Sequence, residues 1–151
     1  MAVAEMGGHD GGEVDGFHVG RVPEGAGELV SDFASEWEDV SFATRVWERA
    51  VDDGHRVDLR VHVLRGERLT TLVRLREFLA EYHERDSAEW PLAEFGRGDG
   101  VGLAGGGEAF WLVRPGLAVD VLVDVERFGA EASIEVACAI TEVRGGDPGP
   151  G

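Results

Sequence analysis

The chain has 151 residues, with 30 acidic against 14 basic side chains and a formal net charge of −16 at pH 7. It contains no Lys, Asn or Gln, which excludes Schiff-base, phosphate-loop and Ser-Lys chemistry as well as a Cys-His-Asn triad. Because the acidic excess repels polyanions, we expect neither nucleic-acid binding nor attachment to anionic membranes.

The two ends of the chain differ in composition from its middle. Residues 1–16 are acidic and rich in glycine, and residues 144–151 are rich in proline and glycine. We expect both ends to be disordered, which leaves a single domain over residues 17–143. No apolar run approaches the roughly 18 residues of a membrane span, and no leader is recognisable. We therefore expect a cytoplasmic protein, or an extracytoplasmic one if a leader was removed.

The first predicted element, over residues 28–40, has an ambiguous period. Leu29, Phe33 and Trp37 recur at four-residue spacing, which fits a helix, but apolar residues also alternate with serines over residues 29–37. The alternation favours a strand, and a helix stays open.

Two strands and a turn are predicted next. Residues 40–51 are rich in aromatic and β-branched side chains, and residues 57–63 alternate between apolar and polar ones. Between them, Asp52-Asp53-Gly54 has the composition of a tight turn, since Asp and Gly tolerate positive φ. We therefore expect a β-hairpin.

The period then changes to 3.6 residues. The apolar stripe from Leu69 to Tyr82 predicts a helix over residues 71–85, capped by Thr70 or Thr71. The string Asp86-Ser87-Ala88-Glu89 predicts one short capped turn, and residues 92–95 a short strand. The glycine-rich segment 96–107 is expected to be a loop or an irregular edge.

That segment contains a literal G-x-G-x-x-G string at Gly100–Gly105. A dinucleotide fingerprint must follow a buried strand and open a helix, whereas here the residues that follow, 109–113, resemble a strand. We therefore reject a nucleotide site.

The last third predicts a hairpin and a helix. Residues 109–113 and 117–125 form the hairpin, with Val119, Val121, Val123 and Val125 toward the core, and a helix follows over residues 130–143. The complete order predicts an α+β fold, an antiparallel sheet with two main helices packed on it.

No constellation of chemical groups stands out. His18, His55, His62 and His83 lack the spacing of a metal site, and we expect each to be a solvated surface group. We therefore predict no catalytic residue, no cofactor and no metal ligand. Carboxylates are abundant, but sequence alone does not pair them.

One segment has the composition of a contact surface, because charged residues flank its aromatic ones. A covered sheet face with Trp47 buried is an equally good interpretation. The candidate partner-contact residues are Glu36, Trp37, Arg45, Trp47 and Arg49.

The element order carries a resemblance. The strand Arg56–Val63, the helix Leu69–Tyr82, the strands within Ala109–Val125 and a last helix resemble PsbP-like domains, including DcrB-type lipoproteins, over about residues 40–143. The chain also resembles small proteins of unassigned function from high-GC actinobacteria. The resemblance implies a non-enzymatic accessory role and names no ligand.

Three functional hypotheses follow. The preferred one is a non-enzymatic accessory or binding domain for a protein partner or a small molecule. Binding is favoured over an enzymatic activity. The alternatives are a secretion-chaperone-like acidic dimer and a small hydrolase-type enzyme that uses carboxylate and histidine groups. A homodimer is left open in each case.

Overall fold

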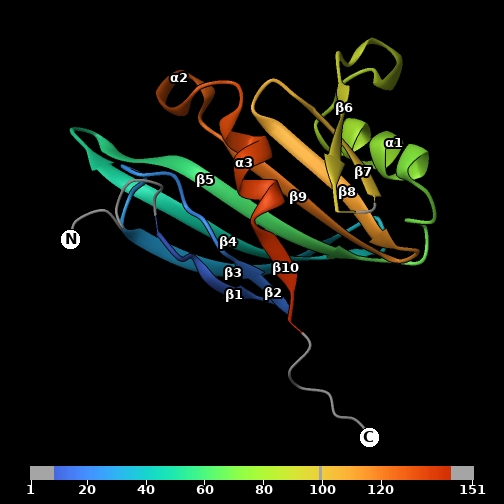
Figure 1. Ribbon diagram of the computed structural model, residues 1–151, viewed down its shortest axis with the longest axis horizontal. Helices are drawn as coiled ribbons and strands as arrows, with labels where there is room; N and C mark the ends of the chain where they lie inside the picture. Colours follow the sequence, from blue (N-terminus) through green and yellow to red (C-terminus); the bar gives the residue numbers. More distant parts are fainter. Residues whose placement is uncertain (1–8, 99, 144–151) are drawn as a thin grey trace, which may run out of the picture.

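The computed structural model of the chain describes residues 9–98 and 100–143. Strands account for 51% of these residues and helices for 19%, so the protein is mainly β-structure. Its strands form a seven-stranded and a three-stranded antiparallel sheet (Figure 1). The expected α+β fold with two main helices is wrong, because within the described ranges only α1 (Leu72–Tyr82) exceeds seven residues.

The large sheet has the order β3-β4-β5-β9-β8-β7-β6. Its two halves meet where β5 pairs with β9, and there His62 lies opposite Asp120. The strands are β3 (Leu29–Trp37), β4 (Val40–Val51), β5 (Gly54–Arg65), β6 (Ala93–Arg97), β7 (Gly100–Gly105), β8 (Glu108–Arg114) and β9 (Leu117–Val123).

The amino-terminal half of this sheet confirms the predicted hairpin. The segment of ambiguous period is a strand, β3, and β4 and β5 are joined at the predicted turn. Gly54 in that turn has a φ of +138°, which side chains with a Cβ rarely adopt.

One face of the large sheet is covered by the small sheet and by α3 (Ala132–Cys138). The small sheet consists of β1 (Gly12–Val14), β2 (Phe17–Val19) and β10 (Ile140–Glu142), with β2 in the middle. β1 thus lies within the segment 1–16 for which disorder was predicted. The predicted tail 144–151 and residues 1–8 lie outside the described residues.

The helix predicted over residues 130–143 is divided. A short helix α2 (Val125–Phe128) precedes α3, and after α3 the chain becomes β10. Ile140 is fully buried and pairs with Val19, so the chain leaves the helix to complete the small sheet. The helical period did not reveal this because the partner strand β2 lies far away in the sequence.

Helix α1 covers the opposite face of the sheet (Figure 1). Thr71 caps it, since its Oγ1 accepts a hydrogen bond from the backbone N–H of Arg74 at 3.1 Å. The helix ends before the predicted residue 85, where Glu84 takes a φ of +58°. The predicted short turn is confirmed as η2 (Ser87–Glu89), with Asp86 as its cap.

The glycine-rich segment, for which a loop or an irregular edge was expected, contains a regular strand, β7. A Cβ on Gly102 would lie 2.6 Å from the ring of Phe95, so glycine permits the close packing of β6 on β7. The G-x-G-x-x-G string is this strand, and it opens no helix.

Candidate functional site

A row of buried polar side chains crosses the centre of the large sheet on the face that α1 covers. Thr44 on β4, His62 on β5 and Asp120 on β9 are directly opposite one another in the strand register. Their exposed fractions are 7%, 5% and 0%. Since burying polar groups costs free energy unless they are partnered, each side chain needs a partner.

Thr44 and His62 satisfy each other. The Oγ1 atom of Thr44 lies 2.7 Å from Nδ1 of His62. Burial lowers the pKa of His62 to about 4, and the positive charge of Arg60 adds to this effect. His62 is therefore neutral at neutral pH, and its assignment to the solvated surface was wrong.

His83 and Glu108 lie next to this row. His83 follows the last residue of α1, and its Nε2 lies 2.9 Å from Oε2 of Glu108, the first residue of β8. The rings of Tyr82 and Trp90 contact the imidazole edge-on and hold its orientation. The side chain of His83 is 19% exposed and that of Glu108 6%, so solvent reaches the cluster from the histidine.

Asp120 is the exception among these groups. It has no exposed surface, and neither of its oxygens accepts a hydrogen bond from an N–H or O–H donor in the described ranges. The carboxyl group of Glu108 faces it instead. Two acceptors that face each other need a proton or a cation between them.

The pKa values of the two carboxyl groups move apart. Burial raises the pKa of Asp120 well above its usual value, and the neighbouring charge of Glu108 adds to the rise. Burial would also raise the pKa of Glu108, but its hydrogen bonds with His83 and Asp120 outweigh burial and lower the pKa. Of the two carboxyl groups, Asp120 therefore keeps a proton to the higher pH.

The three side chains also have the geometry of a metal site. One ligand atom each from His83, Glu108 and Asp120 lies within 4.8 Å of the other two. Zn²⁺ bonds of about 2.0–2.1 Å require tetrahedral ligand atoms about 3.3 Å apart, so the ligand atoms would have to move closer together around an ion. Two carboxylates and one neutral imidazole also balance the charge of a divalent ion.

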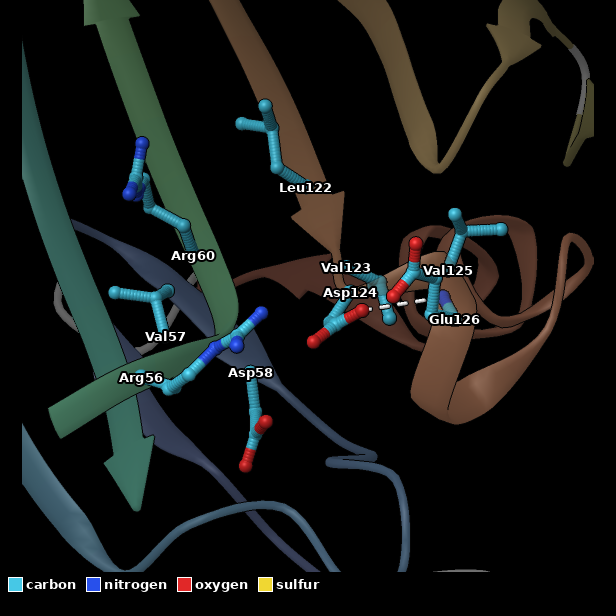
Figure 2. Close-up of a pocket in the computed structure, with 9 residues that line it drawn as sticks. All are labelled: Arg56, Val57, Asp58, Arg60, Leu122, Val123, Asp124, Val125 and Glu126. Atoms are coloured by element: carbon cyan, nitrogen blue, oxygen red, sulfur yellow. Dashed lines mark hydrogen bonds between the residues drawn. The ribbon is translucent and has the colours of Figure 1, made fainter. Parts of the chain in front are cut away.

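A pocket of about 400 Å³ lies beside the cluster, where β5, β9 and the start of α2 meet (Figure 2). Arg60 and Leu122 line it, and Leu122 lies opposite Glu108 in the register. Its other polar residues include both acids and arginines, so the pocket does not select one sign of charge. None of the three candidate ligands lines it.

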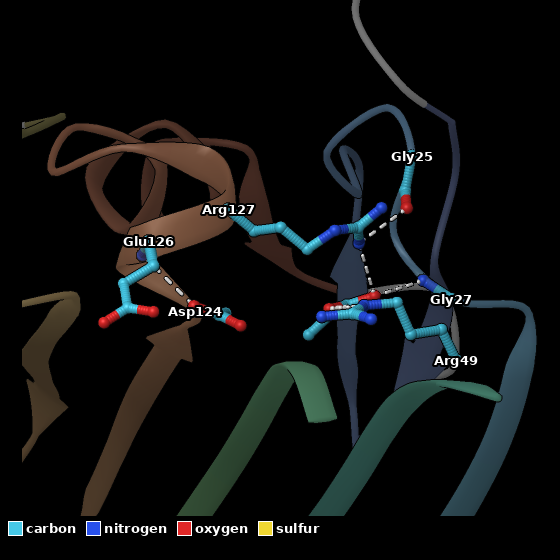
Figure 3. Close-up of polar contacts among 7 residues, drawn as sticks. Gly25, Gly27, Arg49, Asp124, Glu126 and Arg127 are labelled. Atoms are coloured by element: carbon cyan, nitrogen blue, oxygen red, sulfur yellow. Dashed lines mark hydrogen bonds and ion pairs between the residues drawn. The ribbon is translucent and has the colours of Figure 1, made fainter. Parts of the chain in front are cut away.

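A second buried carboxylate, that of Asp58 on β5, is fully partnered. It accepts hydrogen bonds from the backbone N–H of Gly27 at 2.8 Å, from Arg49 at 3.0 Å and from Arg127 at 2.8 Å. Arg127 also donates to the carbonyl of Gly25 at 3.0 Å (Figure 3). Asp58 thus ties α2 and the segment before β3 to the β4–β5 hairpin.

The predicted contact residues on β4 are engaged within the molecule. Trp47 is 2% exposed in the core beneath the small sheet. Arg45 donates to Asp32 at 2.7 Å, and Arg49 donates to Asp58.

The other two predicted contact residues lie on β3. Glu36 is exposed, and Trp37 is half-buried with its ring packed edge-on against Phe78 and Tyr82. Of the five residues, Trp47 thus lies in the core, the two arginines form ion pairs, and Glu36 and Trp37 lie on the edge strand. A partner contact through them stays a prediction.

Glu108 and Asp120 were not among the residues expected from the sequence to form a site. A signal for Asp120 was present, because it is the one polar residue in the apolar strand Leu117–Val123. Glu108 gave no such signal, since it follows a run of glycines in a chain rich in acids.

Comparison with protein-family models, with curated proteins and with solved structures finds no match to this chain. The resemblance to PsbP-like domains therefore stays a prediction. No helix in residues 9–98 and 100–143 has the length and apolar character needed to cross a membrane.

Proposed function

We propose that the protein is a non-enzymatic binding domain whose ligand is one divalent transition-metal ion, held by His83, Glu108 and Asp120. The observation that carries this proposal is the carboxylate of Asp120, which is fully buried and has no donor in the described part of the chain. Such a group is costly unless it is neutral or bound to a cation. The ion would take the place of the proton on Asp120.

The donor set favours Zn²⁺ or Mn²⁺ over the alkaline-earth ions. One imidazole nitrogen and two carboxylate oxygens suit first-row metals, whereas Ca²⁺ takes six to eight oxygen ligands and Mg²⁺ keeps several waters. The ligands come from the end of α1, from β8 and from β9. A bound ion would therefore join the helix to the sheet.

Binding is favoured over catalysis by the enclosure of the cluster. Catalytic zinc sites keep an open position that substrate or water reaches. Here the ligand side chains are between 0% and 19% exposed, and the neighbouring pocket is lined by Arg60 and Leu122 instead. The hydrolase alternative would need a cavity at the titratable groups.

The competing explanation is a purely structural carboxyl pair. Two arginines lie near the pair. The positive charge of Arg60 partly offsets the rise in the pKa of Asp120, and that of Arg85 contributes to the lowered pKa of Glu108. The same positive charges would repel a bound cation. In this explanation, one proton shared by Glu108 and Asp120 takes the place of a metal ion. An asparagine at position 120 imitates the protonated acid but is a poor metal ligand, so this change separates the two explanations.

The test is a titration of metal-stripped protein with Zn²⁺ and, separately, Mn²⁺, followed by calorimetry and by the melting temperature. We expect one equivalent to bind and to raise the melting temperature, since a ligand that binds only the folded state stabilises it. Asp120→Asn should fold normally by circular dichroism and lose about tenfold or more in affinity.

The matched control is Asp53→Asn, in the exposed β4–β5 turn, which should bind like the wild type. The proposal fails if neither ion releases heat nor shifts the melting temperature. It also fails if Asp120→Asn binds as tightly as the control.

A further inference from the structure

Strand β3 is an edge of the large sheet with an unusual number of exposed apolar side chains. Leu29 is 46% exposed, Val30 49% and Phe33 57%. In the described structure no strand pairs with the outer side of β3. Apolar edge strands present unpaired backbone groups and attract another strand.

We infer that β3 pairs antiparallel with β3 of a second copy of this chain, with Phe33 of the two copies on the two-fold axis. The pairing would use all nine residues of the strand and extend one continuous sheet through both molecules. Such an interface is self-complementary, as two-fold symmetry requires. It involves none of the proposed metal ligands and is independent of them.

Apolar side chains match in this register. Leu29, Phe33 and Trp37 lie on one face of β3 because side chains alternate along a strand. With Phe33 opposite Phe33, Leu29 of each copy lies opposite Trp37 of the other. The four-residue spacing of these residues thus places an apolar side chain opposite each of them across the axis. Cross-strand pairs of this kind stabilise antiparallel sheets.

The acidic side chains select the same register. Asp32 lies opposite Ala34 and Glu36 opposite Val30, so no two acids face each other along β3. A shift by two residues places Asp32 opposite either Asp32 or Glu36, and like charges directly opposite each other are unfavourable. A shift by one residue reverses the faces.

The charge of Asp32 is also balanced within each copy. Its carboxylate accepts hydrogen bonds from Nε of Arg45 at 2.7 Å and from Nη2 at 3.0 Å. The guanidinium of Arg45 holds the pKa of Asp32 below its usual value, so this ion pair persists at neutral pH. This pairing reduces the repulsion that two acidic chains would otherwise feel at the edge.

The first test is the mass of the full chain in solution by sedimentation and light scattering. We expect twice the monomer mass of 16.2 kDa for the wild type. Phe33→Asp places two acids on the axis and should halve the mass, while its far-UV circular dichroism spectrum stays that of the folded wild type. Val73→Asp, at a 64% exposed position on α1, is the matched control and should remain dimeric.

The second test reads the register through cysteine cross-linking in a Cys138→Ser background. Phe33→Cys should form a disulfide-linked dimer under mild oxidation, because the two thiols face each other. Ser31→Cys should cross-link poorly alone but readily when mixed with Ser35→Cys. A monomeric wild type, a dimer that survives Phe33→Asp, or cross-linking no faster than in Val73→Cys would overturn the inference.

Discussion

Asp58 and Asp120 are both aspartates without exposed surface, yet their surroundings are opposite. Asp58 lies near the end of the sheet and accepts hydrogen bonds from two arginines and a backbone N–H. Asp120 lies at the centre of the sheet and faces another carboxyl group, with no donor in the described ranges.

The difference shows that burial alone does not identify a functional group. The donors around Asp58 come from β4, α2 and the segment before β3, so its charge holds the fold together. Asp120 accepts no hydrogen bond in the described ranges and faces only the carboxyl group of Glu108, so the fold bears the cost of burying it. A buried acid without donors is therefore the better candidate for a ligand site.

The largest expected effect is that of Asp58→Ala. The change leaves Arg49, Arg127 and the N–H of Gly27 without their acceptor, and breaking a buried ion pair costs about 3–5 kcal/mol. Urea denaturation of the variant measures this loss of unfolding free energy. Asp53→Ala, in the exposed turn, is the control, and equal stability of the two variants would contradict the structural role of Asp58.

A smaller effect is expected from pH. The pKa of His62 is lowered from 6.5 to about 4 in the folded state, so its contribution to stability is fully present above pH 6.5. Acidification from pH 6.5 to about 4 should remove about 3 kcal/mol through this group. The raised pKa of Asp120 acts in the opposite direction, because it penalises the folded state as pH rises above 3.8.

Urea denaturation across this pH range separates the contributions of His62 and Asp120 to the unfolding free energy. In an Asp120→Asn background, the unfolding free energy should fall on acidification more steeply with His62 present than with His62→Gln. Parallel curves for the two proteins would show that His62 is not held neutral by the fold.

The smallest expected effect comes from replacing each of the two buried aspartates, Asp120 and Asp58, by asparagine. In metal-free protein at neutral pH, Asp120→Asn should cause no loss of unfolding free energy, because asparagine is neutral in both states whereas the raised pKa of Asp120 penalises the folded wild type. Asp58→Asn should cost about 1.5–3 kcal/mol, because hydrogen bonds to a charged group are lost. Equal losses in urea denaturation would mean that Asp120 is ionised and partnered.

The local parts of the fold could be predicted from sequence. Alternation identified β4 and β5, the turn residues placed Gly54, and Thr71 marked the start of α1. The division of residues 130–143 could not be predicted, because Ile140 joins a strand only through pairing with the distant Val19. Local periodicity contains no information on such pairing.

The candidate site was beyond prediction for a related reason. Glu108, Asp120 and His83 come from three elements, and only the register of β5, β8 and β9 and the end of α1 bring them together. The identity of Asp120 within an apolar strand was a usable signal. The abundance of acids in the chain concealed its partner.

The small sheet has a consequence for biosynthesis. Its central strand, Phe17–Val19, cannot pair with Ile140–Glu142 until the intervening residues 20–139 have been made. Local hairpins such as β4–β5 form quickly, whereas closure of so long a loop is slow. Phe17 therefore stays uncovered during translation, and a chain that stops before Ile140 would expose the apolar residues beneath the small sheet to chaperones and proteases.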